Sequence, residues 1–206
     1  MCPGVGTFTI VVLGSPGVGK TAIIRQFLSN EFSQVYTPTR RRSVHRPSVI
    51  LDNSIYHLKI VDVPSIPAFP ATGAQEWSDS RCRGLRHANA YILVYDICCP
   101  DSFQSVKTIR QQIGEVRVSS TKQVPIIVVG NKRDLQKQRF TPRRSTSVLV
   151  KKMWKCGYIE CSARYNWHIL LLFKELLSSG VGRSCKHLHS SICIQGALQR
   201  NRCNIM

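Results

Sequence analysis

Residues 14–21 read Gly-Ser-Pro-Gly-Val-Gly-Lys-Thr and follow directly on the apolar run Phe8–Leu13. Glycine at the first and sixth positions, followed by Lys-Thr, is the spacing of a loop that wraps its backbone N–H groups around a phosphate. The loop needs a strand before it and a helix after it, because the N-terminus of that helix adds positive potential at the same point. The segment therefore predicts an α/β domain that binds a phosphate-bearing ligand. The alternative, a glycine-rich turn that binds no phosphate, is weighed against the motifs that follow.

All eight loop residues are candidate nucleotide-binding residues. Lys20 is expected to reach the outer phosphates, which also makes it a candidate catalytic residue, and Thr21 is expected to give its hydroxyl to Mg²⁺. The full set is Gly14, Ser15, Pro16, Gly17, Val18, Gly19, Lys20 and Thr21.

Strand-like apolar runs alternate with helix-like segments along the chain. Strands are predicted at Phe8–Leu13, Ser48–Leu51, Ile55–Val61, Ala90–Ile97, Pro125–Gly130 and Tyr158–Cys161. Helices are predicted at Lys20–Ser29, Gln75–Arg86, Ser102–Arg117, Pro142–Trp154 and Asn166–Leu177. This order predicts an α/β fold with a mostly parallel six-stranded sheet, one antiparallel edge strand, and helices on both faces.

The 206 residues suit one domain at 1–179 and a flexible basic tail at 180–206, where the pattern dissolves into Gly, Ser, His, Arg and Cys. No apolar run is long enough to cross a bilayer and no secretory signal is visible, so we expect the cytosolic side of the membrane. The nine cysteines are scattered and are expected to be mostly buried thiols. Cys185, His187, His189 and Cys193 have metal-ligand chemistry, but their spacing matches no usual zinc finger.

The net charge of +18 allows three kinds of partner: nucleic acid, an anionic lipid surface or acidic proteins. It also allows a basic surface that is merely solvated. Charge alone does not choose among these alternatives.

Two later segments point to guanine as the base. Asn131-Lys132-Arg133-Asp134 follows a predicted strand, and the Asp134 carboxylate can accept two hydrogen bonds from the N1–H and 2-amino groups of guanine, which adenine lacks. After the next strand, the turn at Ser162-Ala163-Arg164 can offer backbone donors to the guanine carbonyl. GTP and GDP are therefore favoured over ATP.

Together these three segments resemble the small GTPases of the Ras superfamily over nearly the whole chain. Within that superfamily, the runs at 91–98, 161–167 and 195–198 are similar to the Ras-like protein family member 10 branch. The resemblance implies a P-loop GTPase fold and GTP hydrolysis with Mg²⁺. It also implies that Phe32 packs against the guanine, that Thr39 coordinates Mg²⁺ when the γ-phosphate is present, and that Asp62 holds Mg²⁺ through water. Asn131, Lys132, Asp134, Ser162, Ala163 and Arg164 are the expected base-binding residues.

The chain departs from the family after Asp62. Ras-type proteins continue with Thr-Ala-Gly-Gln, whose glutamine orients the attacking water. Here the sequence is Val63-Pro64-Ser65-Ile66, in which Ile66 cannot polarise water and only Ser65 can offer a backbone donor to the γ-phosphate. Gln75 could fold back to the water site, but that placement tolerates little error. We therefore expect slow hydrolysis, with Lys20, Thr39 and Ser65 as the catalytic candidates.

Two further departures concern partners. Pro16 stands where Ras has glycine, so its ring is expected to crowd the arginine of a Ras-type activating protein. Arg40-Arg41-Arg42 replace the acidic residues that engage the basic effector domains of Ras, which predicts an effector with an acidic surface.

Cys203-Asn204-Ile205-Met206 fits a prenylation motif that favours a farnesyl group on Cys203. One prenyl chain binds membranes weakly, and Arg183, Lys186, Arg200 and Arg202, or palmitoylation of Cys185 or Cys193, would supply the second signal. The expected location is the cytoplasmic face of the plasma membrane.

The sequence thus favours a lipid-anchored GTP/GDP switch, expected to be a monomer that works with an exchange factor, a GTPase activator and an effector. A GTP-binding scaffold that barely hydrolyses is the alternative. Nucleic-acid binding is not expected, because no recognition helix or aromatic platform is recognisable.

Overall fold

The computed structural model describes residues 7–51, 54–117, 124–180 and 192–194. Its strands are β1 (Phe8–Gly14), β2 (Ser43–His45), β3 (Ser48–Leu51), β4 (Ser54–Asp62), β5 (Ala90–Asp96), β6 (Ile126–Asn131), β7 (Gly157–Glu160) and β8 (Ile192–Ile194). Its α-helices are α1 (Lys20–Ser29), α2 (Gly73–Ser78), α3 (Pro100–Arg117), α4 (Arg143–Val148) and α5 (Ile169–Gly180). A 3₁₀ segment covers Arg133–Gln138, and a π-helical turn at Leu149–Met153 continues α4.

One sheet organises the described part of the chain. Its order is β7-β6-β5-β1-β4-β3-β8, with β2 pairing β4 as an eighth strand. The strands from β7 to β4 run parallel, whereas β2 and β3 are antiparallel to β4 and β8 is antiparallel to β3. The predicted α/β fold with a mostly parallel sheet is confirmed. The predicted six strands with one antiparallel edge strand are wrong, because the described residues form eight strands, of which β2, β3 and β8 belong to antiparallel pairs.

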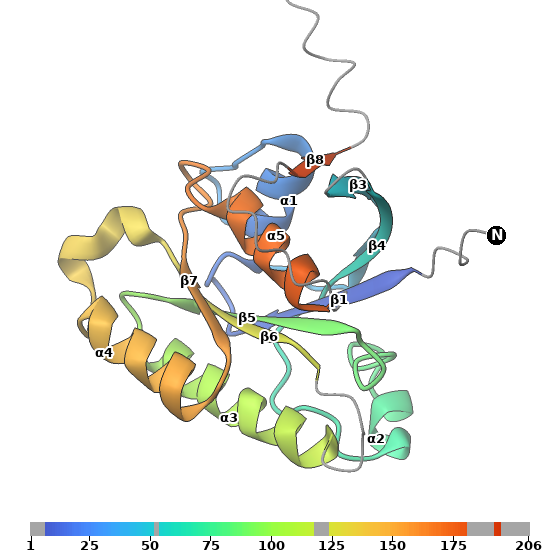
Figure 1. Cartoon of the computed structure of the whole chain (residues 1–206). Coiled ribbons are helices and arrows are strands. Elements are labelled where there is room, and N and C mark those ends of the chain that lie inside the picture. The colour runs from blue at the N-terminus through green and yellow to red at the C-terminus, as the bar shows by residue number, and fades with distance from the viewer. Residues whose placement is uncertain (1–6, 52–53, 118–123, 181–191, 195–206) are drawn as a thin grey trace, which may run out of the picture.

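Helices cover both faces of this sheet, with α1 and α5 on one face and α3 and α4 on the other (Figure 1). The central strand β1 shows why the apolar run Phe8–Leu13 does not alternate with polar residues. Ile10 and Val12 pack into the core under α1 and α5, whereas Val11 and Leu13 pack into the core on the opposite face. A parallel strand buried on both sides needs apolar residues at every position.

Helices α1 and α5 are held against each other by aromatic packing. Phe27 of α1 stacks on Phe173 of α5 with ring centroids 3.7 Å apart. This contact holds α1, whose N-terminus follows the Gly14–Thr21 loop, against the sheet. The loop therefore connects two elements that are held in the core, β1 and α1.

Three details differ from the sequence prediction. The predicted helix Gln75–Arg86 ends at Ser78, and turns follow it. The short strand β2 was not predicted, because Ser-Val-His offers no long apolar run. Residues 192–194, predicted to belong to a flexible tail, form β8 on the edge of β3, where a β-branched Ile-Cys-Ile segment can pair with free backbone groups.

None of the helices in the described residues has the length and apolar character needed to cross a bilayer. Of the described cysteines, Cys82 and Cys161 are buried as predicted, and Cys98, Cys99 and Cys156 are half-buried free thiols. The cluster of Cys185, His187 and His189 lies outside the described residues.

Candidate nucleotide-binding site

The loop between β1 and α1 adopts a conformation that depends on its glycines. Gly14, Gly17 and Gly19 have φ values of 147°, 72° and 96°. A Cβ on Gly14 would clash with the Val94 carbonyl of β5, and one on Gly19 would clash with the Asn131 amide. The loop is therefore compressed against two neighbouring strands, and its N–H groups are left to form the concave nest that the motif predicts.

Lys20 is folded over this loop. Its Nζ donates to the carbonyls of Gly14 and Ser15 at 2.9 and 3.0 Å. Burial lowers the pKa of Lys20, and the nearby charge of Asp62 opposes that effect. An ammonium held at the mouth of the nest is placed to meet the phosphate oxygens that the nest attracts.

The three predicted Mg²⁺ ligands meet at one point. The Thr21 hydroxyl of α1 donates to Asp62 Oδ2 of β4 at 2.5 Å, and it lies 2.8 Å from the Thr39 hydroxyl of the loop before β2. Asp62 Oδ1 is buried and has no hydrogen-bond partner among the described residues. Burial raises the pKa of Asp62, while the Thr21 hydrogen bond and the Lys20 charge oppose the rise.

These oxygens fit a hard divalent cation. Mg²⁺ favours hydroxyl and carboxylate oxygens, and a buried carboxylate oxygen without a partner is costly unless a cation or donor meets it. Thr21, Thr39 and Asp62 are therefore the residues that would hold Mg²⁺.

The predicted base-binding loops are linked to the phosphate loop through Asn131. Its Nδ2 donates to the Val18 carbonyl at 2.8 Å, and its Oδ1 accepts from the Ala163 N–H at 3.1 Å. One side chain at the end of β6 thus ties the phosphate loop to the turn after β7. The Ala163 N–H, expected to face a base, is engaged by Asn131 in this structure.

Asp134 and Lys132 are oriented by partners that sequence reasoning missed. The Ser162 hydroxyl donates to Asp134 Oδ1 at 2.6 Å, which leaves Oδ2 for another donor. Lys132 Nζ forms an ion pair with Asp96 Oδ2 at 2.7 Å. Asp96 is the last residue of β5, next to β6 in the sheet, so a carboxylate at that strand end was the signal available in the sequence.

Two residues predicted to contact the base, Phe32 and Arg164, take no part in these hydrogen bonds and ion pairs. Phe32 is 39% exposed, and no ring contact involves it among the described residues. The Arg164 guanidinium lies over the Tyr165 ring, 5.3 Å from its centroid. Their roles remain predictions from the resemblance.

The segment after Asp62 is anchored in the core by buried side chains and hydrogen bonds. Ile66 and Phe69 are buried with the residues under α3, and the Phe69 N–H donates to Gln112 Oε1 of α3 at 2.8 Å. The Ser65 carbonyl accepts from the Arg81 guanidinium at 3.1 Å. These contacts fix the path of residues 66–72, which are rich in Pro and Ala.

Gln75 is used for a different purpose from the one considered for it. Its Oε1 accepts from the Ala71 N–H at 2.8 Å, and its own N–H donates to the Thr72 hydroxyl at 3.2 Å. Thr72 and Gln75 form a capping box at the start of α2. The side chain that could have oriented water is committed to the helix terminus.

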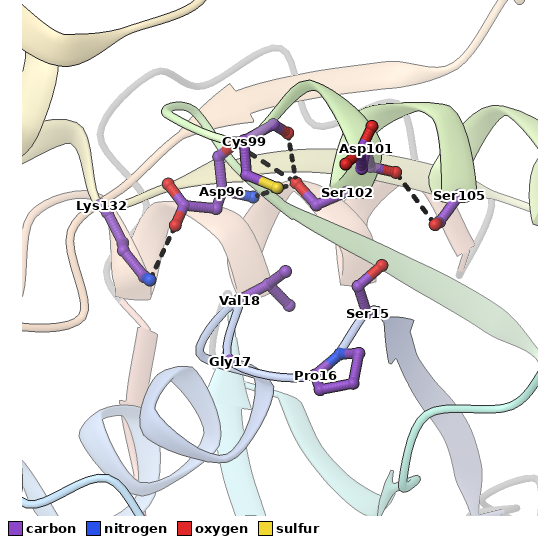
Figure 2. A pocket seen from close by; sticks show the side chains of 10 residues that line it. All are labelled: Ser15, Pro16, Gly17, Val18, Asp96, Cys99, Asp101, Ser102, Ser105 and Lys132. Carbon is purple, nitrogen blue, oxygen red and sulfur yellow. Dashed lines mark hydrogen bonds and ion pairs between the residues drawn. The ribbon is translucent and has the colours of Figure 1, made fainter.

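A cavity of about 260 Å³ adjoins the phosphate loop on the side of α3. Figure 2 shows Ser15 and Pro16 on one wall, the start of α3 on the other, and the Lys132–Asp96 ion pair at one end. Pro16 is exposed, so its ring borders open space beside the loop.

Cys203 and the basic tail residues lie outside the described residues.

Comparison with known proteins agrees with this geometry. The Ras family model matches residues 9–181. Human Ras-like protein family member 10B is 60% identical over 202 residues, which cover 98% of this chain and 100% of that protein. Human and mouse Ras-like protein family member 10A are 48% and 47% identical, each over 98% of this chain and 99% of the relative. The chain belongs to the Ras family of small GTPases, in the branch of the Ras-like family 10 proteins.

Proposed function

We propose that this protein is a membrane-anchored GTP/GDP switch whose hydrolysis step is slow. The observation that carries the switch is the meeting of Thr21, Thr39 and Asp62 around a carboxylate oxygen without a partner. Thr39 belongs to a segment that is otherwise exposed, so this shared cation site is what ties that segment to the nucleotide.

Each part of the site has one task in this proposal. The loop N–H groups and Lys20 bind and orient the phosphates, and Asp134, positioned by Ser162, selects guanine. Mg²⁺, when bound, supplies charge neutralisation at the β- and γ-phosphates. Thr39 coordinates Mg²⁺ only when the γ-phosphate is present in this proposal, so loss of the γ-phosphate releases Thr39 and the segment around it.

Slow hydrolysis follows from two side chains. Ile66 is buried under α3, and Gln75 caps α2, so neither is available to orient the attacking water. The remaining candidates, Lys20, Thr39 and Ser65, stabilise charge but abstract no proton. The second candidate function, a GTP-binding scaffold, rests on the same two observations.

Single-turnover hydrolysis of GTP-loaded, purified protein separates these two functions. A switch predicts a slow but measurable first-order release of phosphate, whereas a scaffold predicts none before nucleotide dissociates. A rate equal to or above that of ordinary Ras proteins contradicts both.

We further propose anchoring at the cytoplasmic face of the plasma membrane through a farnesyl group on Cys203. The basic residues Arg183, Lys186, Arg200 and Arg202 and palmitoylation of Cys185 or Cys193 supply the second signal. An exchange factor and a GTPase activator complete the cycle, with Pro16 excluding activators of the Ras type.

The effector in this proposal presents an acidic surface to Arg40, Arg41 and Arg42. A basic Ras-effector domain would meet like charge there, which costs several kcal/mol. A pull-down of the GTP-loaded protein with such a domain should recover none of it, and GTP-dependent capture would contradict the proposal.

A further inference from the structure

Trp77 is a large aromatic side chain that the fold leaves in solvent. It lies on α2 and is 70% exposed. The guanidinium carbon of Arg83 sits 5.7 Å from the centre of its ring. Trp and Arg are the residues most often found at the energetic centre of protein interfaces, so an exposed pair of this kind is a candidate contact surface.

Arg42 comes from a different part of the chain and lies close to this pair. It directly precedes β2, and its guanidinium packs near the backbone of Gly84, the residue after Arg83. Arg42 Nε is buried with no hydrogen-bond partner among the described residues. Burial and the positive charge of Arg83 both lower the pKa of Arg42, which means that two guanidiniums repel each other there.

Arg81 lies two residues before Arg83, and its charge is neutralised by a carboxylate of the chain itself. It forms a bidentate contact with Asp79, with a shortest distance of 2.6 Å. The ion pairs among the described residues include neither Arg42 nor Arg83. These two charges are left for a group that the described chain does not supply.

We propose that Arg42, Trp77 and Arg83 form one docking surface for an acidic protein segment. Neighbouring carboxylates of that segment bind between the two guanidiniums, and its apolar side chains pack on the Trp77 ring. The inference rests on the proposed function, because Arg42 follows the Thr39 segment and Trp77 follows the Asp62 segment, the two segments that meet at the cation site. It deepens that function by adding α2 to the effector surface.

The geometry favours an acidic peptide over a nucleic acid. Single-stranded nucleic acid stacks successive bases on several aromatic rings, whereas Trp77 is the one ring of this surface and Arg83 covers one of its two faces. A carboxylate pair requires no such face and matches the planar donors of two guanidiniums.

The test measures fluorescence anisotropy of a labelled glutamate-rich peptide with the full chain loaded with GDP or with a non-hydrolysable GTP analogue. Arg42→Gln and Arg83→Gln are each expected to weaken the peptide about ten-fold, because each removes one charge-assisted contact. Trp77→Ala is expected to weaken it by about the same factor. Arg144→Gln, an exposed arginine of α4, removes the same charge elsewhere and should leave the affinity unchanged.

The proposal is overturned if all four variants bind the peptide with the affinity of the unchanged chain. It is also overturned if Arg144→Gln loses as much affinity as Arg83→Gln. Tighter binding of a labelled single-stranded RNA than of the peptide, lost in Arg83→Gln, overturns it in favour of nucleic acid. GDP uptake is measured on the same samples by calorimetry. Failure to bind GDP refutes the proposed function, whereas normal GDP binding with unchanged peptide affinity refutes only this surface.

Discussion

Asn131 connects the parts of the site more than any other single residue. The sequence identified it as a base-binding residue from the Asn-Lys-x-Asp pattern, but its bonds to Val18 and Ala163 could not be foreseen. They depend on how closely β6 approaches the phosphate loop, which is set by packing and not by local sequence. Lys132 and Asp96 illustrate the same limit, because their 2.7 Å ion pair joins two strands that are distant in the chain.

Gly19 is expected to be the most sensitive glycine of the loop. Gly19→Ala would push a methyl group into the Asn131 amide at a φ of 96°, and we predict a loss of about 2–4 kcal/mol in the free energy of unfolding together with weaker GDP binding. Gly17→Ala is the matched control, since nothing lies within 4 Å of its Cβ and only its φ of 72° opposes the change. That variant should lose about 1–2 kcal/mol. Urea denaturation measures both, and equal losses would contradict the close approach at Asn131.

The segment from Asp62 to α2 is the element whose structure the sequence predicted least well. A helix was predicted as far as Arg86, yet α2 ends at Ser78, where Asp79 becomes extended and its carboxylate accepts from the Arg81 N–H, and Gly84 adopts a φ of 75°. The sequence after Asp62 was interpreted as a departure from the Ras pattern. Its burial against α3 needed the tertiary structure, since Pro-Ala-Phe-Pro gives no periodic signal.

Restoring glutamine at position 66 is expected to fail as a repair of catalysis. Ile66→Gln would bury an amide under α3, and we predict a loss of about 2–3 kcal/mol in stability with no faster GTP hydrolysis. Single-turnover assays and urea denaturation of the same preparation give both values. A clear gain in the hydrolysis rate would show that the segment can reach the phosphate after all.

Gln75→Ala tests the other side of the same argument. Loss of the capping box should cost about 1 kcal/mol while leaving the hydrolysis rate unchanged. Glu115→Ala, at an exposed position near the end of α3, is the control for differences between protein preparations. A large fall in hydrolysis for Gln75→Ala alone would identify this glutamine as the water-orienting residue.

The whole molecule combines a Ras-type nucleotide site with a strongly basic chain. Fold class and sheet direction were predictable from the alternation of strand-like and helix-like segments, and the clustering of Thr21, Thr39 and Asp62 was expected from the phosphate-loop motif together with the resemblance to the Ras superfamily. The pairing of β8 with β3 was not, since three residues within a polar tail carry too weak a signal.

Cys203→Ser is expected to release the protein from membranes to the cytosol, because the basic tail alone binds anionic lipid weakly and reversibly. Fractionation of cells that express the variant provides the measurement, and Cys2→Ser serves as a cysteine control that should stay on the membrane. The residual binding of Cys203→Ser to anionic vesicles should fall as salt rises. Unchanged membrane residence of Cys203→Ser would refute the lipid anchor.

The claim on which the rest depends is that the Gly14–Thr21 loop binds a phosphate while Asp134 selects guanine. Isothermal titration calorimetry of the intact chain in Mg²⁺, with GDP, GTP and ATP as ligands, tests both halves at once. The account predicts binding of both guanine nucleotides, ATP binding weaker by about a thousand-fold or more, and loss of that preference in Asp134→Ala. Absence of heat with GDP and GTP from folded protein, or equal affinity for ATP, would contradict it.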